Sequence, residues 1–539
     1  MSLDTSGGCA PAPLGARLTG LYTRTLIWSL VGVLVLWLVG LEGIHGNVTP
    51  FYAIPAPAFR TAAVPLAMAA LIGAAYLLLG RPYVRRSNRR TAAAVAACAL
   101  LAALAASALY QDAVAQSQPL RAVAAEYARL MRWHLLAFLV FCGGLAVCLR
   151  VLAWIRWFDQ DPSPRSVAWF LAGLIAFAAL FACAVAMIRG GPAGIAQAYA
   201  RHTYEYVGDI GAGGSIQELF GRYLRLRPHL SMHARVHPPG PIALLWIFSY
   251  VVGREPMALS LATVAFGALA IAPLYWWTRE LTDKRTALTC CLLYSVIPAI
   301  VLFTATSADI LFAPFTLLTL FLFTRAIQRG AVAYALAAGL GYGVMSLLSF
   351  SLVGIGAYFA LVGLWKLRRA PTAVVTTAAA TLLAFIAIHA AVRLWSGFDM
   401  IACFQACKAQ FDADQRHLDL MTPRWPAWTW RIVNPLSWLF FAGIPVSVLF
   451  VKRLLRPDPA RKGLFLVCLL TLAALNLLYL ARGEGERSAL YVFPFLALPA
   501  AHLIEAWGRN AKSVTPLVAT LAFLAFQCWL IESYFYTYW

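Results

Sequence analysis

The stretch HARVHPPGPIALLWIFSYVVGREP, from His233 to Pro256, decides how the rest of the chain is interpreted. Its apolar part, residues 241–253, is thirteen residues long, whereas a helix needs about twenty residues to cross a bilayer. Pro241 stands at the first turn of this segment, where a helix does not need the missing backbone N–H. The stretch therefore predicts a re-entrant or juxtamembrane half-helix that dips into the membrane border and returns on the same side.

The composition assigns most of the chain to lipid. Of 539 residues, 62% are hydrophobic and only 12% are charged, and the mean hydropathy is +0.74. A soluble protein of this length does not need so many apolar residues. The net charge of +21 is best explained by Arg and Lys gathered in cytoplasmic loops. We therefore expect an all-α polytopic membrane protein without a nucleic-acid partner.

About fifteen apolar segments are long enough to cross a membrane. They divide into an N-terminal four-helix membrane segment (1–165), a central core (166–400) and a C-terminal group of helices (401–539). The predicted spans are 25–43, 61–80, 91–110, 133–155, 166–188, 257–277, 286–304, 308–325, 331–348, 351–366, 372–394, 434–452, 463–481, 488–506 and 514–534.

Basic short loops predict the orientation of these spans. The loops 81–90, 150–165, 276–285, 365–371 and 451–462 are rich in Arg and Lys, which favours the cytoplasm. With the N-terminus inside, only one crossing fits between 189 and 276, and 257–277 supplies it. The segment 241–253 therefore does not span. The extracytoplasmic face then receives the turn around Asp309 and three loops, at 189–240, 395–433 and 482–487.

The loop 189–240 carries the first candidate site residues. Glu205 and Asp209 are four residues apart, so they would share a face if the stretch were helical. With Tyr204 beside them, they predict an acid/base or sugar-binding cluster, although exposed loop carboxylates often have no function. The arginines of this loop, Arg235 among them, either suit a lipid phosphate or lie at the level of the headgroups.

Two further polar groups reach the same face. The sequence RGEGER places Arg482, Glu484, Glu486 and Arg487 within six residues between two apolar helices. Charges at a membrane border are costly unless they pair with each other or serve a function, and both alternatives remain open here. Asp309, in the sequence SADI, fits either a helix cap or a site residue.

These features occur in an order that resembles the GT-C superfamily of integral-membrane glycosyltransferases. That superfamily includes protein O-mannosyltransferases and lipid A aminoarabinose transferases. The resemblance covers about residues 165–330: an acidic extracytoplasmic loop, then HPPGP (His237–Pro241), TRELTDKR (Thr278–Arg285), and Pro298 with Asp309. The chain departs from the family in having four helices before this region. Its two loop acids are also not adjacent, since they occur as EYVGD.

The resemblance implies a GT-C-like core that transfers a hexosyl or pentosyl group, with inversion, from a polyprenyl-phosphate donor held in the membrane. The acceptor would be a hydroxyl of a glycan, lipid or protein on the extracytoplasmic face. This activity belongs to the cell envelope, and we expect a bacterial plasma (inner) membrane. No cofactor is certain, although some members of the superfamily use a divalent cation such as Mg or Mn, and no dense carboxylate cluster in the sequence demands one.

For catalysis we expect Asp209 to act as the base, with Glu205 as the second candidate. His233 and His237 would orient the acceptor or the phosphate, although His237 also fits a backbone hydrogen bond at a helix start. The expected substrate-binding residues are Tyr204, Arg235, His233, His237, Asp309, Arg482, Glu484, Glu486 and Arg487.

The alternative function is a polytopic transporter or flippase of a lipid-linked or small anionic substrate. A transporter would show charges in the middle of its helices and an internal repeat. The central helices contain almost no charged residues, and we find no repeat. The sequence therefore favours the enzyme.

Overall fold

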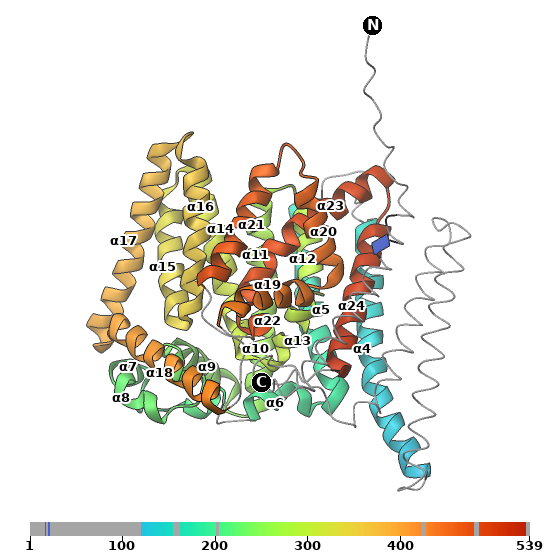
Figure 1. The fold of residues 1–539 in the computed structure, drawn as a ribbon. Helices are drawn as coiled ribbons and strands as arrows, with labels where there is room; N and C mark the ends of the chain where they lie inside the picture. Colours follow the sequence, from blue (N-terminus) through green and yellow to red (C-terminus); the bar gives the residue numbers. More distant parts are fainter. Residues whose placement is uncertain are drawn as a thin grey trace.

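The computed structural model describes residues 17, 20–21, 120–154, 162–200, 204–421, 427–478 and 484–534. Within these residues every regular element is a helix (Figure 1). The predicted all-α fold is therefore confirmed for this part of the chain. The predicted spans at 25–43, 61–80 and 91–110 lie outside the described residues.

The helices follow one another in three groups along the chain. The first comprises α4 (Leu120–Trp154), α5 (Pro164–Gly190), α6 (Ala193–Ala200), η2 (Tyr206–Asp209), α7 (Ile216–Gly221), α8 (Tyr223–Leu226), η3 (Arg227–His229), η4 (Ala234–Val236) and α9 (Gly240–Val252). The second comprises α10 (Pro256–Ala268), α11 (Ile271–Leu281), α12 (Lys284–Tyr294), α13 (Pro298–Thr306), η5 (Ala308–Leu311), α14 (Phe312–Arg329), α15 (Val332–Leu348), η6 (Phe350–Ile355), α16 (Gly356–Leu367) and α17 (Pro371–Ser396). The third comprises α18 (Met400–Met421), η7 (Ala427–Thr429), α19 (Trp430–Phe441), α20 (Ile444–Leu455), α21 (Lys462–Leu478), α22 (Gly485–Ser488), η8 (Leu490–Val492), α23 (Phe493–Ala511) and α24 (Thr515–Tyr534).

The described residues contain several membrane spans. Eight helices are long and apolar enough to cross a bilayer, and two bent helix pairs raise the number to at most ten. The predicted polytopic membrane protein is confirmed by this result. The number fifteen and the division at residues 165 and 400 remain predictions.

The segment 434–452, expected to form one span, is instead divided between α19 and α20. The two helices meet at an angle of 111°. The bend falls at Gly443, whose φ of +89° is open to glycine at little cost, and Pro445 follows at the start of α20. A milder bend of 55° separates α12 from α13, directly before Pro298 at the first turn of α13.

The segment 395–433, predicted as a loop, contains the 22-residue helix α18. Neither glycine nor proline interrupts residues 400–421. The Asp399 carboxylate accepts a hydrogen bond from the Ala402 N–H at 2.9 Å and so caps the start of α18. Cys403 and Cys407 are buried on one face of α18. The apolar-span criterion missed this helix because nine of its 22 residues are polar or charged, and these are spread along residues 405–419.

The half-helix predicted from the opening stretch is α9. Its start packs so closely on the end of α15 that a side chain at Gly240 would overlap the Leu347 carbonyl. The helix also packs against η2 and α7, and beyond its other end the Arg254 guanidinium lies beside Gly211, just after η2. Both ends of α9 therefore lie at the same end of the bundle as α7, α8 and α18 (Figure 1), which we call the loop end.

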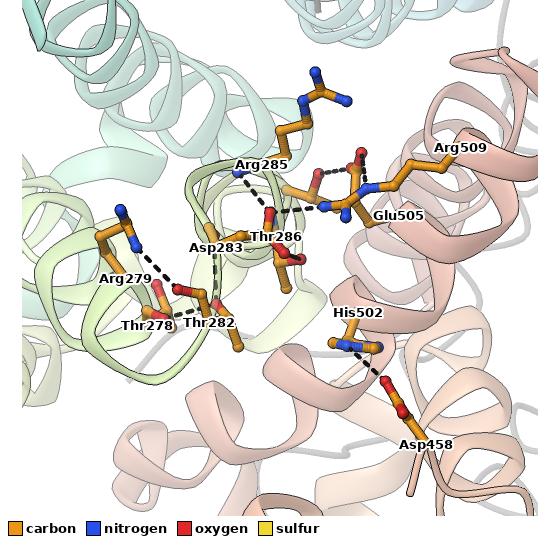
Figure 2. Close-up of polar contacts among 11 residues, drawn as sticks. Thr278, Arg279, Thr282, Asp283, Arg285, Thr286, Asp458, His502, Glu505 and Arg509 are labelled. Atoms are coloured by element: carbon orange, nitrogen blue, oxygen red, sulfur yellow. Dashed lines mark hydrogen bonds and ion pairs between the residues drawn. The ribbon is translucent and has the colours of Figure 1, made fainter. Parts of the chain in front are cut away.

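Polar contacts at the opposite end, which we call the basic end, join α12 to α23 (Figure 2). Asp283 caps α12 by accepting from the Thr286 N–H at 3.1 Å, and Arg509 Nη2 lies 2.7 Å from its carboxylate. Burial opposes the charge of Asp283, but the Thr286 N–H and Arg509 outweigh it and lower the pKa of this carboxyl. Glu505 of α23 accepts from Thr289 of α12 at 3.0 Å.

A second set of contacts ties the α20–α21 turn to the same end. Arg461 donates to the Leu281 carbonyl at 2.7 Å, which satisfies one of the open carbonyls at the end of α11. Asp458, in the same turn, lies 3.6 Å from His502 Nε2 of α23 (Figure 2). The basic end thus fixes α12 and α23, which both lead toward the loop end, one through α13 and the other through α22 and η8.

A cysteine in place of Arg254 is expected to react with a membrane-impermeant maleimide from the same side as a cysteine in place of Lys408 on α18. All three test positions, Arg254, Lys408 and Arg456, are exposed. Arg456→Cys, at the basic end, should react only from the other side. The experiment treats oriented vesicles with the maleimide and identifies the labelled cysteines by mass spectrometry of their peptides. Labelling of R254C and R456C from one side would show that α9 crosses the membrane.

Candidate active site

Arg487 is the centre of a buried ionic cluster at the loop end. Its Nη1 lies 3.9 Å from Glu205 Oε1 and 3.4 Å from Asp309 Oδ2. Its Nη2 lies 2.6 Å from Glu484 Oε2. We call Glu205, Asp309, Glu484 and Arg487 the carboxylate cluster. Three separate parts of the chain, before η2, in η5 and around α22, supply its members.

Burial makes the pairing within this cluster necessary. Glu205 is 1% exposed and Arg487 is 4% exposed, and isolated charges are very costly in such surroundings. Burial disfavours the guanidinium charge, but the carboxylates of Glu484, Asp309 and Glu205 outweigh it and raise the pKa of Arg487 above its usual range. The guanidinium therefore remains charged and holds the three acids together.

The backbone around Glu484 shapes the turn that presents Arg487. Glu484 has a φ of +57°, and it is one of two non-glycine residues with positive φ in the described part of the chain. This left-handed conformation costs about 1–2 kcal/mol for a residue with a side chain. The Glu484 carbonyl accepts from the Arg487 N–H at 3.1 Å and the Ser488 N–H at 2.9 Å. This turn brings the Glu484 and Arg487 side chains together, so that they form their ion pair.

Asp309 does not act as the cap of its helix. Ser307 fills that role, because its Oγ accepts from the Asp309 N–H at 3.2 Å. The same hydroxyl donates to Asp309 Oδ2 at 3.2 Å, on the carboxylate oxygen that contacts Arg487. The cap therefore orients the Asp309 carboxylate toward the cluster.

Two histidines border the cluster on the side of η2 and η4. His233 Nδ1 lies 3.5 Å from Glu205 Oε2, and its backbone N–H donates to the Tyr204 carbonyl at 3.2 Å. The buried Tyr206 ring is close to both imidazoles, with its centroid 6.1 Å from that of His233 and 6.0 Å from that of His237. An acid, two imidazoles and an aromatic ring therefore share one small region.

Asp209 is bound differently from Glu205. Its two carboxylate oxygens accept from the Ser231 N–H at 3.1 and 3.0 Å. Burial raises the pKa of Asp209, and the hydrogen bonds from Ser231 and the charge of Arg235 oppose the rise. Its contacts join η2 to residue 231, so they close the loop between the two segments.

The remaining residues predicted for the site lie in varied surroundings. Tyr204 is exposed, and Arg235 is partly buried. Glu486 points away from the cluster toward α19, where it accepts from Ser437 Oγ at 2.8 Å. Burial raises the pKa of Glu486 to about 8, so this carboxyl is mostly protonated at pH 7. Arg482 lies outside the described residues.

Sequence reasoning missed the polar partners that orient these acids. Ser307 stands two residues before Asp309 in SADI, and a serine before a helix start is a recognisable cap signal. Ser231 and Ser437 carry no such signal, because each meets its acid through the tertiary fold. Tyr223 and Cys407 were also missed. Both donate to the His237 carbonyl, Cys407 Sγ from 3.6 Å.

In the described part of the chain, no group of three or more His, Cys, Asp or Glu side chains is placed to hold a metal ion. In the carboxylate cluster the Arg487 guanidinium occupies the place that a metal ion would have in a metal site.

Residues 236–395 match the dolichyl-phosphate-mannose-protein mannosyltransferase family. The match supports a GT-C superfamily glycosyltransferase. It begins directly before His237 and includes α9 and Asp309. Glu205 and Arg487 lie outside the matched residues, so the ionic cluster joins the matched region to parts of the chain on either side of it. No curated protein matches this chain.

Replacing Arg487 with Gln should destabilise the protein strongly. The change leaves Glu205 and Asp309 buried without their cation, and breaking a buried pair in this way costs about 3–5 kcal/mol. The matched control is Arg222→Gln, because Arg222 pairs with Glu218 at the surface, where the two side chains are 60% and 43% exposed. An exposed pair is worth at most about 1 kcal/mol. The measurement is the unfolding temperature in detergent. Equal unfolding temperatures for R487Q and R222Q would contradict the structural role of Arg487.

Proposed function

We propose that this protein transfers a hexosyl or pentosyl group from a polyprenyl-phosphate donor to an acceptor hydroxyl, with inversion, on the extracytoplasmic face of a bacterial plasma membrane. One observation carries the proposal. Arg487 holds carboxylates from separate segments together at the loop end, in a chain whose residues 236–395 match a membrane mannosyltransferase family. The acceptor would be a glycan, lipid or protein of the cell envelope.

The charge distribution supports the side of the membrane. The turns at the basic end carry Arg279, Lys284, Arg285, Arg368, Arg369, Arg456, Arg461 and Lys462. Short loops rich in Arg and Lys favour the cytoplasm. The cluster lies at the other end of the bundle, and would therefore face outward.

Within this proposal Glu205 is the base and Asp209 maintains the fold of the loop. Neither oxygen of Glu205 accepts a hydrogen bond from the described residues, so either oxygen can accept one from a substrate hydroxyl. Asp209 already binds the Ser231 N–H through both oxygens. This assignment gives the leading role to the acid that the sequence analysis placed second.

The reaction balances with one proton acceptor and one leaving group. The acceptor oxygen attacks the anomeric carbon on the face opposite the phosphate, and its proton passes to Glu205. The new C–O bond forms as the bond to the phosphate oxygen breaks, and the phosphate leaves with that electron pair. We assign Arg235 to the developing phosphate charge. Its buried Nε–H makes no hydrogen bond to any described residue.

Glu205→Gln should reduce turnover by about 10²–10⁴-fold, the usual contribution of a general base, while donor binding is retained. Asp209→Asn, the matched control, should lower the unfolding temperature. It should reduce the turnover of the folded protein less than Glu205→Gln does. The assay uses proteoliposomes, a panel of polyprenyl-phosphate hexoses and pentoses, and a cell-envelope extract as the acceptor. It measures transfer of labelled sugar and release of polyprenyl phosphate. Full turnover by E205Q would contradict the assignment of the base, and no transfer from any donor would contradict the function.

A further inference from the structure

His237 is fixed in one tautomer by its own loop. Its Nδ1 lies 3.0 Å from the His233 carbonyl oxygen. A carbonyl oxygen only accepts hydrogen bonds, so Nδ1 carries the proton. In the neutral ring, Nε2 is then left with a lone pair and no hydrogen. Nε2 makes no hydrogen bond to any residue in the described part of the chain.

The surroundings keep this ring neutral. Burial lowers the pKa of His237 below its usual value. Asp309 and the hydrogen bond to the His233 carbonyl oppose this change, and the positive charges of His233 and Arg487 add to it. Asp309 and Arg487 belong to the carboxylate cluster, so His237 lies within electrostatic reach of the candidate site. At pH 7 its Nε2 is therefore a hydrogen-bond acceptor beside the cluster.

His237 is held both at its backbone and at its imidazole ring. Its carbonyl accepts from Tyr223 Oη and from Cys407 Sγ of α18. Pro238 and Pro239 follow it and restrict the chain before α9. The Tyr206 ring stands edge-on to the imidazole at an interplanar angle of 85°. These contacts would hold the imidazole in a fixed position, as a group that binds a ligand requires.

We propose that Nε2 of His237 accepts a hydrogen bond from a hydroxyl of the donor sugar and thereby selects donors that carry a hydroxyl at that position. This inference rests on the proposed function and adds a specificity residue to it. No bond to Nε2 forms or breaks, because Glu205 remains the acceptor of the transferred proton. Once the bound sugar covers Nε2, an acceptor left without its donor disfavours an analogue that lacks the hydroxyl.

The test compares kcat/KM for an active polyprenyl-phosphate hexose with its monodeoxy analogues. With the wild-type protein, one analogue should lose about 10–100-fold more than the others, since its complex leaves Nε2 without a hydrogen-bond donor. His237→Asn can still donate to the His233 carbonyl but has no group at the Nε2 position, so it should treat that analogue and the parent alike. The matched control is His229→Asn, because His229 is exposed in η3. H237N with the wild-type pattern of penalties would overturn the inference.

The pH profile gives a second readout. Protonation converts Nε2 from an acceptor into a donor, so wild-type activity should fall as the pH drops through the lowered pKa of His237, below about 6.5. H237N should lack this fall. A fall in activity that persists in H237N and disappears in His233→Asn would assign the fall to His233 and overturn the inference.

Should H237N not fold, His237→Gln takes its place, because its amide oxygen can reach the Nε2 position. H237Q should discriminate against the same analogue without the acid-side fall, and an unchanged fall overturns the proposal. Wild-type protein inactive on all donors would overturn the proposed function as well.

Discussion

The ion pairs of Arg487 are the constraint on which the loop end of this protein depends. A guanidinium that is 4% exposed must be neutralised, and the segments before η2, in η5 and around α22 each contribute a carboxylate to do so. The same requirement acts in the other direction, because Glu205 has no hydrogen-bond donor among the described residues and depends on Arg487 and His233 for electrostatic compensation. The segments that form the site therefore order one another.

The helices deliver these segments to one place from far along the chain. The bend between α12 and α13 leads into Ser307 and Asp309, while the strained turn at Glu484 sets the direction of Arg487. At the basic end, Thr289 donates to the buried Glu505 carboxylate and joins α12 to α23. The two helices that precede Asp309 and follow Arg487 are thus fixed relative to each other by contacts on the far side of the bundle.

Much of this arrangement could be predicted from the sequence, because it follows from lengths and charges. The thirteen-residue segment 241–253 is too short to cross a bilayer, and this length predicted that residues 189–240, Asp309 and Arg487 lie on one side. Helix α18 was not predicted because polar and charged residues interrupt its apolar ones. The sequence also did not predict that Asp209 is hydrogen-bonded through both oxygens while Glu205 is not. Their spacing implied a shared helical face, but Glu205 is extended, at φ −96° and ψ 157°, and only the residues after it turn into η2. Ser231, which binds Asp209, is set by the tertiary fold.

The charge of the cluster limits how a phosphate donor could lie. Among the described residues, three carboxylates surround one guanidinium, so the cluster is net negative. Two unit charges 4 Å apart interact by about 4 kcal/mol at an effective dielectric constant of about 20, and a phosphate beside these acids would be repelled. Arg235 lies in η4, close enough to Asp209 for its positive charge to lower the pKa of that carboxyl. A donor with its phosphate toward Arg235 and its sugar toward Glu205 and His237 satisfies both constraints. In the proposed reaction this orientation would place the acids beside the sugar and the attacking hydroxyl, where a proton is removed, and the arginine beside the group that leaves with negative charge.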